Sequence, residues 1–318
     1  MGLPKSITIS VPGTSANLGP GFDILGLALK VYNEFKFYFD PSIGYSATLK
    51  NGQALPFSES DDLVYSAYKN YFKIFLPNIS YPTYQCKMEL DLPMKGGLGS
   101  SASAVVAGFC LAREIHKDLY ANQPIPSEAR FLYELAMLEG HPDNTSPAYL
   151  GGFVLSYFDK RGHISYYKKK FPNSVAIFAL TPNTEVSTHE SRKVLPSTYS
   201  VDDVIFNMTR IATWIQFFET RRFSDLQLAL QDRVHTPYRV PHISGLREII
   251  AIAERKQMAT CLSGSGPTLL IFMERKKVKS LEKAFGLEVA EVMKNLGVSY
   301  KLSRMQTDTI GVKIVKQR

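Results

Sequence analysis

The sequence predicts an α+β protein of two domains, because strand-like and helix-like segments follow one another without strict alternation. The chain has 318 residues, of which 45% are hydrophobic and 21% are charged, a composition typical of globular proteins. This length corresponds to about two domains of the usual ~100–200 residues. We place the boundary beside a turn at Arg161-Gly162, so that the domains are 1–158 and 159–318.

Alternation of apolar and polar residues predicts the strands of the first domain. Apolar side chains recur at every second position around residues 7–11, 35–39 and 86–92. This period is typical of a strand with one buried face, in an antiparallel or mixed sheet. Helical spacing predicts helices over 63–75, 102–110 and 132–138, the last after a Ser127 cap, and a strand follows over 151–156.

The second domain shows the same mixture of elements. Strands are expected over 175–180, 269–272, 298–302 and 309–315. Helices are expected over 204–219, 246–255 and 278–296. The sequence shows no internal repeat and no low-complexity segment.

Charge and cysteine content exclude several kinds of protein. The formal charge is +8, but no basic stripe is interleaved with aromatic residues, so we expect anion steering and no nucleic-acid partner. Cys86, Cys110 and Cys261 lie far apart, which argues against a disulfide framework or a zinc site and favours the cytoplasm. No apolar run approaches ~20 residues, so we expect no membrane segment.

A glycine-rich segment follows the strand over 86–92 and precedes an amphipathic helix. Its glycines allow close approach of backbone N–H groups to a phosphate, and the helix N-terminus adds partial positive charge. Two hydroxyl groups in it can bind phosphate oxygens or a divalent cation. The segment consists of Pro93, Met94, Lys95, Gly96, Gly97, Leu98, Gly99, Ser100, Ser101, Ala102 and Ser103.

Two known phosphate motifs fit this segment less well. It lacks the Gly-Lys-Ser/Thr of a Walker-type loop. Gly97, Gly99 and Ala102 match a dinucleotide fingerprint, which would make the protein a nicotinamide dehydrogenase. That fingerprint needs a buried strand before it and an acidic residue about 20 residues on, after a second strand. The strand here is amphipathic, and Asp118 lies in a polar stretch.

Three further segments combine turn-forming and polar residues. Residues 11–23 hold Asn17 and Asp23 on a glycine-containing loop, although Asp23 could instead cap a helix at Ile24. Residues 139–144 place Glu139, Asp143 and Asn144 where a divalent cation could bind, or simply end a helix. Residues 262–268 form a backbone-rich loop or a plain turn.

Together these four segments resemble the kinase family of galactokinase, homoserine kinase, mevalonate kinase and phosphomevalonate kinase (GHMP kinases). The resemblance covers essentially the whole chain. Within the family, the segments 14–19, 186–196 and 232–239 are most similar to the homoserine kinase branch, and the lysine of the mevalonate kinase loop is absent. The resemblance implies an N-terminal domain like ribosomal protein S5, a ferredoxin-like C-terminal domain, an active site in the cleft between them, and a homodimer.

The resemblance also implies an ATP site with magnesium. Gly96 to Ser103 would wrap the triphosphate, with Ser101 and Glu139 as Mg²⁺ ligands. The adenine would lie in a pocket formed partly by Asp62, Leu63 and Val64.

The acceptor implied by the resemblance is L-homoserine, a zwitterion with a side-chain hydroxyl. Its carboxylate would be bound by arginine, whose planar fork suits carboxylates, and its ammonium by a carboxylate. The residues assigned to this substrate are Asn17, Asp23, Asn144, Thr188, Arg192 and Arg239.

Where mevalonate kinases have a catalytic aspartate, this chain has Asn144, which cannot accept a proton. Because phosphoryl transfer depends mainly on positioning and charge neutralisation, we expect catalysis without a protein base. Asn144, Ser101 and Glu139 are thus the expected catalytic residues, with Asp143 a less favoured base. Two alternatives remain open: a family kinase for another small alcohol, and an ATP-binding sensor without turnover.

Overall fold

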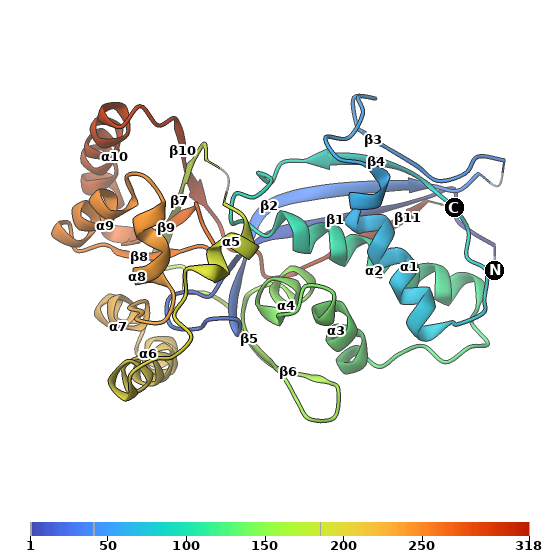
Figure 1. Cartoon of the computed structure of the whole chain (residues 1–318), viewed down its shortest axis with the longest axis horizontal. Helices are drawn as coiled ribbons and strands as arrows, with labels where there is room; N and C mark the ends of the chain where they lie inside the picture. Colours follow the sequence, from blue (N-terminus) through green and yellow to red (C-terminus); the bar gives the residue numbers. More distant parts are fainter. Residues whose placement is uncertain (1, 41, 185, 318) are drawn as a thin grey trace.

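The structure is a computed structural model that describes residues 2–40, 42–184 and 186–317. It contains a seven-stranded and a four-stranded sheet, which lie at opposite ends of the molecule with helices against both (Figure 1). The predicted α+β class is confirmed. In the described ranges, no helix combines the length and apolarity needed to cross a bilayer.

The larger sheet has the order β11-β1-β2-β4-β3, and β5 extends it from β2 to β6. Its inward face carries alternate apolar residues such as Ile7, Ile9 and Phe35, which form one core with α1, α2 and α3. On the outward face, Ser10 donates a 3.1 Å hydrogen bond to Glu34. The elements are β1 Ser6–Ala16, β2 Leu25–Tyr38, β3 Ser46–Leu49, η1 Glu59–Asp61, α1 Leu63–Phe75, β4 Gln85–Leu90, α2 Ser100–Leu119, α3 Glu128–Met137, α4 Pro142–Leu150, β5 Phe153–Phe158, β6 Ile164–Lys169 and β11 Lys313–Gln317.

The smaller sheet, in the order β10-β7-β9-β8, is antiparallel and covered on both faces. Val175 and Ile177 pack with the apolar residues of α6 and α7. Ala176 and Phe178, on the opposite face, pack with α9 and α10. The elements are β7 Val175–Pro182, α5 Thr188–Lys193, α6 Val201–Thr220, α7 Phe223–Ala229, α8 Thr236–Arg239, η2 Val240–His242, α9 Leu246–Arg255, β8 Ala259–Leu262, β9 Leu269–Glu274, η3 Arg275–Lys277, α10 Val278–Asn295 and β10 Tyr300–Met305.

The two sheets divide the chain differently from the expected boundary at 158/159. Strand β6 forms an antiparallel hairpin with β5, so it extends the larger sheet past residue 158. Strand β11 returns to pair with β1, so the C-terminus also belongs to the larger sheet. The chain therefore enters the second sheet between residues 169 and 175. The alternative that Asp23 caps a helix at Ile24 is excluded, because Leu25 opens β2.

An apolar cluster joins the two halves of the molecule. Leu27 and Phe153 of the larger sheet lie in one buried cluster with Trp214, Phe217 and Phe218 of α6. The ring centroids of Phe153 and Trp214 are 4.9 Å apart. This contact fixes the second domain against the ends of β1 and β2, where the polar loops meet.

Candidate active site

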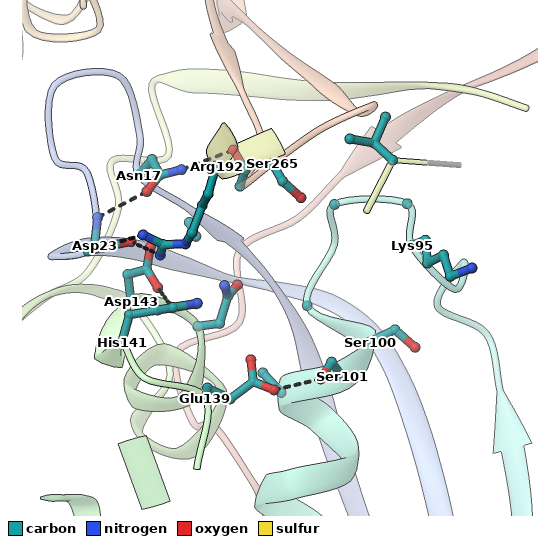
Figure 2. Close-up of a pocket in the computed structure, with 18 of the residues that line it drawn as sticks. Asn17, Asp23, Lys95, Ser100, Ser101, Glu139, His141, Asp143, Arg192 and Ser265 are labelled. Atoms are coloured by element: carbon teal, nitrogen blue, oxygen red, sulfur yellow. Dashed lines mark hydrogen bonds and ion pairs between the residues drawn. The ribbon is translucent and has the colours of Figure 1, made fainter. Parts of the chain in front are cut away.

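A cavity of about 440 Å³ lies between the two domains. Its walls come from the β1–β2 loop, the start of α2, the segment joining α3 to α4, and α5, α8 and the loop after β8. Figure 2 shows that hydroxyl groups and a carboxylate gather at the α2 side, whereas Asp23 and Arg192 lie at the opposite side. The cavity thus has two chemically different ends.

The segment 93–99, here called the phosphate loop, turns through left-handed conformations before α2 begins. The φ angles of Lys95, Gly97 and Gly99 are 54°, 77° and 72°. Gly99 immediately precedes α2 and offers no side chain to cap it. The first N–H groups of a helix have no partner within it, and its dipole is positive at that end. The arrangement suits a bound anion.

Hydrogen bonds from the second domain hold the phosphate loop. The carbonyl oxygens of Gly96 and Gly97 each accept a 2.6 Å bond from a hydroxyl, of Thr268 and Ser263 respectively. A Cβ on Gly97 would lie 2.6 Å from the Ser263 carbonyl oxygen, so no larger residue fits there. Both domains therefore determine the shape of the loop.

Part of the predicted nucleotide-binding segment lines the cavity. Its lining includes Lys95, Gly96, Gly97, Gly99, Ser100, Ser101 and Ala102. Three other predicted residues, Pro93, Met94 and Leu98, line a separate hollow between the domains. Ser103 is buried and donates a 2.7 Å hydrogen bond to the Ser100 carbonyl oxygen.

The three residues predicted around adenine have different surroundings. Leu63 is 40% exposed and lines the cavity. The Asp62 carboxylate caps α1, accepting bonds of 2.8 and 3.1 Å from the Val64 and Tyr65 amides. Val64 itself is in the core. Leu63 is thus the member of this group whose side chain can contact a ligand in the cavity.

Ser101 and Glu139 meet at the α2 end of the cavity. The Ser101 hydroxyl donates a 2.6 Å hydrogen bond to Glu139 Oε1. Burial raises the pKa of the Glu139 carboxyl, and the bond from Ser101 offsets this only in part. A hydroxyl and a carboxylate at this separation are ligands that a hard cation such as Mg²⁺ prefers, so the pair fits the predicted metal.

Asn144, on α4, also lines the cavity. Its Oδ1 accepts a 2.7 Å hydrogen bond from the Thr14 hydroxyl. With Oδ1 oriented by this bond, the amide NH₂ can donate to a ligand in the cavity. Asn144 is therefore placed as a hydrogen-bond donor.

The neighbouring Asp143 is 1% exposed and lies 2.5 Å from Nδ1 of His141. Burial alone would lower the pKa of His141, but its bond with Asp143 raises it above the usual value. Asp23, His141 and Asp143 form a compact group of potential metal ligands. Asp143 is already bound to His141 and Asp23 to Arg192, so both carboxylates are occupied by the protein's own side chains.

The far end of the cavity contains an ion pair of the two predicted substrate residues. Arg192 donates from Nη2 to Asp23 Oδ1 at 2.6 Å and from Nη1 to Oδ2 at 3.1 Å. Asp23 has a φ of 62°, and its amide donates a 3.1 Å bond to Asn17 Oδ1. Asn17 in turn donates to the Gly264 carbonyl oxygen at 3.0 Å. This loop therefore holds its carboxylate opposite α5.

Arg239 lies beside this pair and is 3% exposed. Its guanidinium donates to the carbonyl oxygens of Ser191 and Gly264 at 3.2 and 3.1 Å. Burial lowers the pKa of Arg239 to about 10, so it remains a cation at neutral pH. The Phe22 ring lies 5.1 Å from the Arg192 guanidinium and 5.2 Å from that of Arg239. Two cations thus face one end of the cavity.

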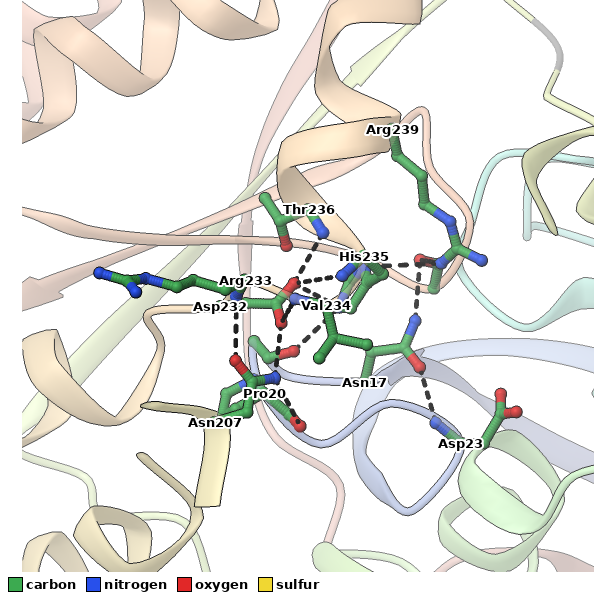
Figure 3. Close-up of polar contacts among 12 residues, drawn as sticks. Asn17, Pro20, Asp23, Asn207, Asp232, Arg233, Val234, His235, Thr236 and Arg239 are labelled. Atoms are coloured by element: carbon green, nitrogen blue, oxygen red, sulfur yellow. Dashed lines mark hydrogen bonds and ion pairs between the residues drawn. The ribbon is translucent and has the colours of Figure 1, made fainter. Parts of the chain in front are cut away.

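Behind Arg239, a buried network joins α6 and α8 to the β1–β2 loop (Figure 3). His235 is fully buried, and its Nε2 lies 2.9 Å from the Gly19 carbonyl oxygen. Because a carbonyl can only accept, Nε2 carries the proton, which leaves Nδ1 as an acceptor 3.5 Å from Arg239 Nη1. Burial lowers the pKa of His235, consistent with this neutral form.

Asp232 organises the same network. Its carboxylate accepts bonds of 2.8 Å from Asn207 of α6 and of 2.6 Å from the Thr236 amide at the start of α8. Burial alone would raise the pKa of Asp232, but the hydrogen bonds from Asn207 and from the backbone amides lower it. The network therefore fixes α8, which carries Arg239, against the loop that carries Asp23.

Sequence reasoning brought most of these groups together but missed three. The structure places Asn17, Asp23, Asn144, Arg192 and Arg239 around one cavity. The side chain of Thr188, also predicted there, is outside the described part of the chain. Phe22 and His141 line the cavity without having been predicted, and His235 supports it from behind. His141 lies two residues after Glu139 and His235 four residues before Arg239, both within segments already singled out, which was an available signal.

Comparison with family models identifies both halves of the chain. The model described as GHMP kinases N terminal domain matches residues 62–152. The model described as GHMP kinases C terminal matches residues 215–290. The matched ranges include the phosphate loop and Glu139 in the first half, and Asp232 to Arg239 in the second.

Curated relatives and solved structures agree with this match. A homoserine kinase of Clostridium beijerinckii is 33% identical over 98% of this chain and 99% of its own. One of Solibacter usitatus is 36% identical over 84% and 85%. The crystal structure of homoserine kinase from Cytophaga hutchinsonii, at 21% identity, covers 99% of both chains with a TM-score of 0.81, which shows a common fold. A complex of MDDEF with MVAPP, AMPPCP and magnesium shares the fold at a TM-score of 0.69, with 16% identity over 98% of this chain and 99% of that one.

Proposed function

The chain belongs to the homoserine kinases of the GHMP family, enzymes that phosphorylate the side-chain hydroxyl of L-homoserine with ATP, and from this premise we propose how its residues divide the work. The product is O-phospho-L-homoserine, an intermediate of threonine synthesis. One observation carries the assignment of roles. A single cavity has an amide-rich loop and a Ser–Glu pair at one end, and a carboxylate with two arginines at the other.

The nucleotide end binds the triphosphate of ATP. The N–H groups of the phosphate loop and of the first turn of α2 donate to its oxygens, and Leu63 contacts the adenine. Ser101 and Glu139 hold Mg²⁺, which neutralises the charge of the phosphates. Their separation of 2.6 Å supports ligation of one ion, and a bound cation would favour the ionised form of Glu139.

The other end binds the zwitterion of L-homoserine. The substrate inserts between Asp23 and Arg192, so that Asp23 pairs with the ammonium and Arg192 with the carboxylate. Arg239 supplies a second cation for the carboxylate, and Asn17 and Thr188 complete the polar shell. The existing ion pair between Asp23 and Arg192 supports this assignment, because each group is already held opposite a charge of the sign it would meet in the substrate.

Phosphoryl transfer proceeds without a protein base. Asn144 donates from its amide to the acceptor hydroxyl oxygen and orients it toward the γ-phosphate. Asp143 is less suited as a base because it is buried and already shares a hydrogen bond with His141. Since the transition state is loose, positioning and neutralisation of the phosphate charge supply most of the rate.

The direct test is ADP release from the purified protein with Mg²⁺ and ATP. We expect release to depend on L-homoserine and to be at background with mevalonate or galactose. Turnover only with an acceptor lacking the amino-acid group would contradict the assigned substrate end. Binding of both ligands without ADP release would identify a sensor instead of an enzyme.

The same proposal includes the localisation, the partners and the oligomeric state of the enzyme. The enzyme acts in the cytoplasm, which is supported by its three buried, free cysteines. It has no nucleic-acid partner, because the basic groups beside its cavity serve the small anionic ligands. It functions as a homodimer.

A further inference from the structure

The outer face of α6 is apolar along most of its length. Val201, Val204, Ile205, Met208 and Ile215 are 73%, 44%, 52%, 65% and 67% exposed. Their spacing of three, four and seven residues places them on one side of the helix, together with the exposed Ala212. We call these six residues the α6 outer face.

The opposite side of α6 already provides the helix with its core contacts. Trp214, Phe217 and Phe218 are buried against the second sheet. The outer face is therefore a second apolar side, which none of the described residues covers. Figure 1 shows α6 at the lower edge of the molecule. Six apolar side chains at about half exposure form a patch on the order of 400 Å², a size that often marks a binding surface.

We propose that two copies of this chain associate through the α6 outer face, with the two helices antiparallel across a two-fold axis. This inference rests on the proposed homodimer and assigns its interface. The centre of the face lies between Met208 and Ala212, so in the dimer each Met208 packs beside the partner copy's Ala212.

The charges at the two ends of α6 favour a second copy as the partner. The exposed Asp202 lies in the first turn, and the exposed Arg221 and Arg222 follow the last turn. In an antiparallel pair, the acidic start of one helix lies beside the basic end of the other. A parallel pair would bring like charges together, and a two-fold axis across the helices requires the antiparallel arrangement.

Two faces would together bury roughly 800 Å² of apolar surface, and the polar rim brings the total near the ~1,200 Å² of a stable interface.

Measurement of mass in solution tests the proposal. Light scattering after size-exclusion chromatography should give twice 35.6 kDa for the wild type. Met208→Glu combined with Ile215→Glu should give the monomer mass while retaining a cooperative thermal transition. Leu287→Glu on α10, where Leu287 is 64% exposed, is the matched control and should remain dimeric.

The possible outcomes test the α6 interface, the homodimer and the kinase activity separately. A monomeric wild type at about 50 μM would overturn both the homodimer and this interface. A dimer that persists in the double variant would overturn the α6 interface alone. ADP release, measured in parallel, reports on the catalytic assignment independently of either result.

A cysteine placed on the outer face tests the geometry. All three native cysteines are buried, so an introduced surface cysteine is the reactive one. Oxidation of Ala212→Cys should give a disulfide-linked dimer, because the axis passes close to this position, whereas Leu287→Cys should stay monomeric on a denaturing gel. Failure of Ala212→Cys to cross-link would contradict the antiparallel arrangement.

Discussion

Replacement of Arg192 by Met removes one charge from the substrate end of the cavity. Its side chain is 40% exposed and that of Asp23 33%, so their ion pair is worth only about 0–1 kcal/mol and is easily opened by a substrate. The proposed fork on the homoserine carboxylate is charge-assisted, at about 1.5–3 kcal/mol for each hydrogen bond. Allowing for partial compensation by Arg239, we expect a loss of ~2–4 kcal/mol in transition-state binding, or roughly 30–1,000-fold in kcat/KM.

The assay compares L-homoserine with 3-aminopropan-1-ol, which has the same ammonium and hydroxyl but no carboxylate. Arg192→Met should reduce kcat/KM for homoserine and leave the small activity with the amino alcohol nearly unchanged, so the preference for homoserine collapses. The KM for ATP should stay within about two-fold.

Lys193→Met is the matched control for this prediction. Lys193 is the next residue on α5, and it pairs with Glu190 at the surface, with its side chain 57% exposed. We expect wild-type kinetics from it. The reasoning would be refuted if Arg192→Met lost activity equally with both alcohols, or if the two variants behaved alike.

Substitutions at three further positions test other parts of the site. Glu139→Gln should raise the Mg²⁺ concentration for half-maximal rate at least ~10-fold. Because the pKa of Glu139 is raised, the Mg²⁺ affinity of the wild type should fall as the pH drops through that pKa. The Gln variant should lack this pH dependence. Asn144→Asp keeps the oxygen bonded by Thr14 but loses the NH₂ donor, so kcat should fall ~10–100-fold as in Asn144→Ala, and an Asp variant as fast as wild type would support a protein base. His235→Ala should raise the KM for homoserine ~10-fold without changing the KM for ATP. His235→Gln retains an N–H donor for Gly19 and should restore part of the affinity for homoserine. A loss of thermal stability with both KM values unchanged would exclude a positioning role. Because the pKa of His235 is lowered, its neutral form stabilises the fold above pH ~6.5. This contribution is lost as the pH falls, by at most about 1.4 kcal/mol per pH unit. Urea unfolding of the wild type and of His235→Gln at several pH values would measure the loss.

Local patterns in the sequence predicted most of the regular elements. The helices over 63–75 and 246–255 have the predicted bounds, because their apolar spacing is regular and their core faces are clear. Helix α4 was missed, since residues 142–150 are mostly polar or small and lack a helical apolar period. Pro142 at its first position was the available signal, because proline is favoured there.

Long-range contacts explain what the sequence could not predict. The alternation near the C-terminus indicates a strand, but not that Ile314 pairs with Ile9 at the other end of the chain. The sequence likewise separates Asp23 from Arg192 by 169 positions, so only the fold reveals that they pair.

The most direct test of the account is a crystal structure with a non-hydrolysable ATP analogue, Mg²⁺ and L-homoserine. We expect the phosphates within hydrogen-bonding distance of the amides of Gly96 to Ser101, and the metal bound by Ser101 and Glu139. The homoserine carboxylate should contact Arg192 and Arg239, and the Asp23–Arg192 bond should be replaced by bonds to the substrate. Nucleotide bound elsewhere, with the phosphate loop empty, would contradict the account.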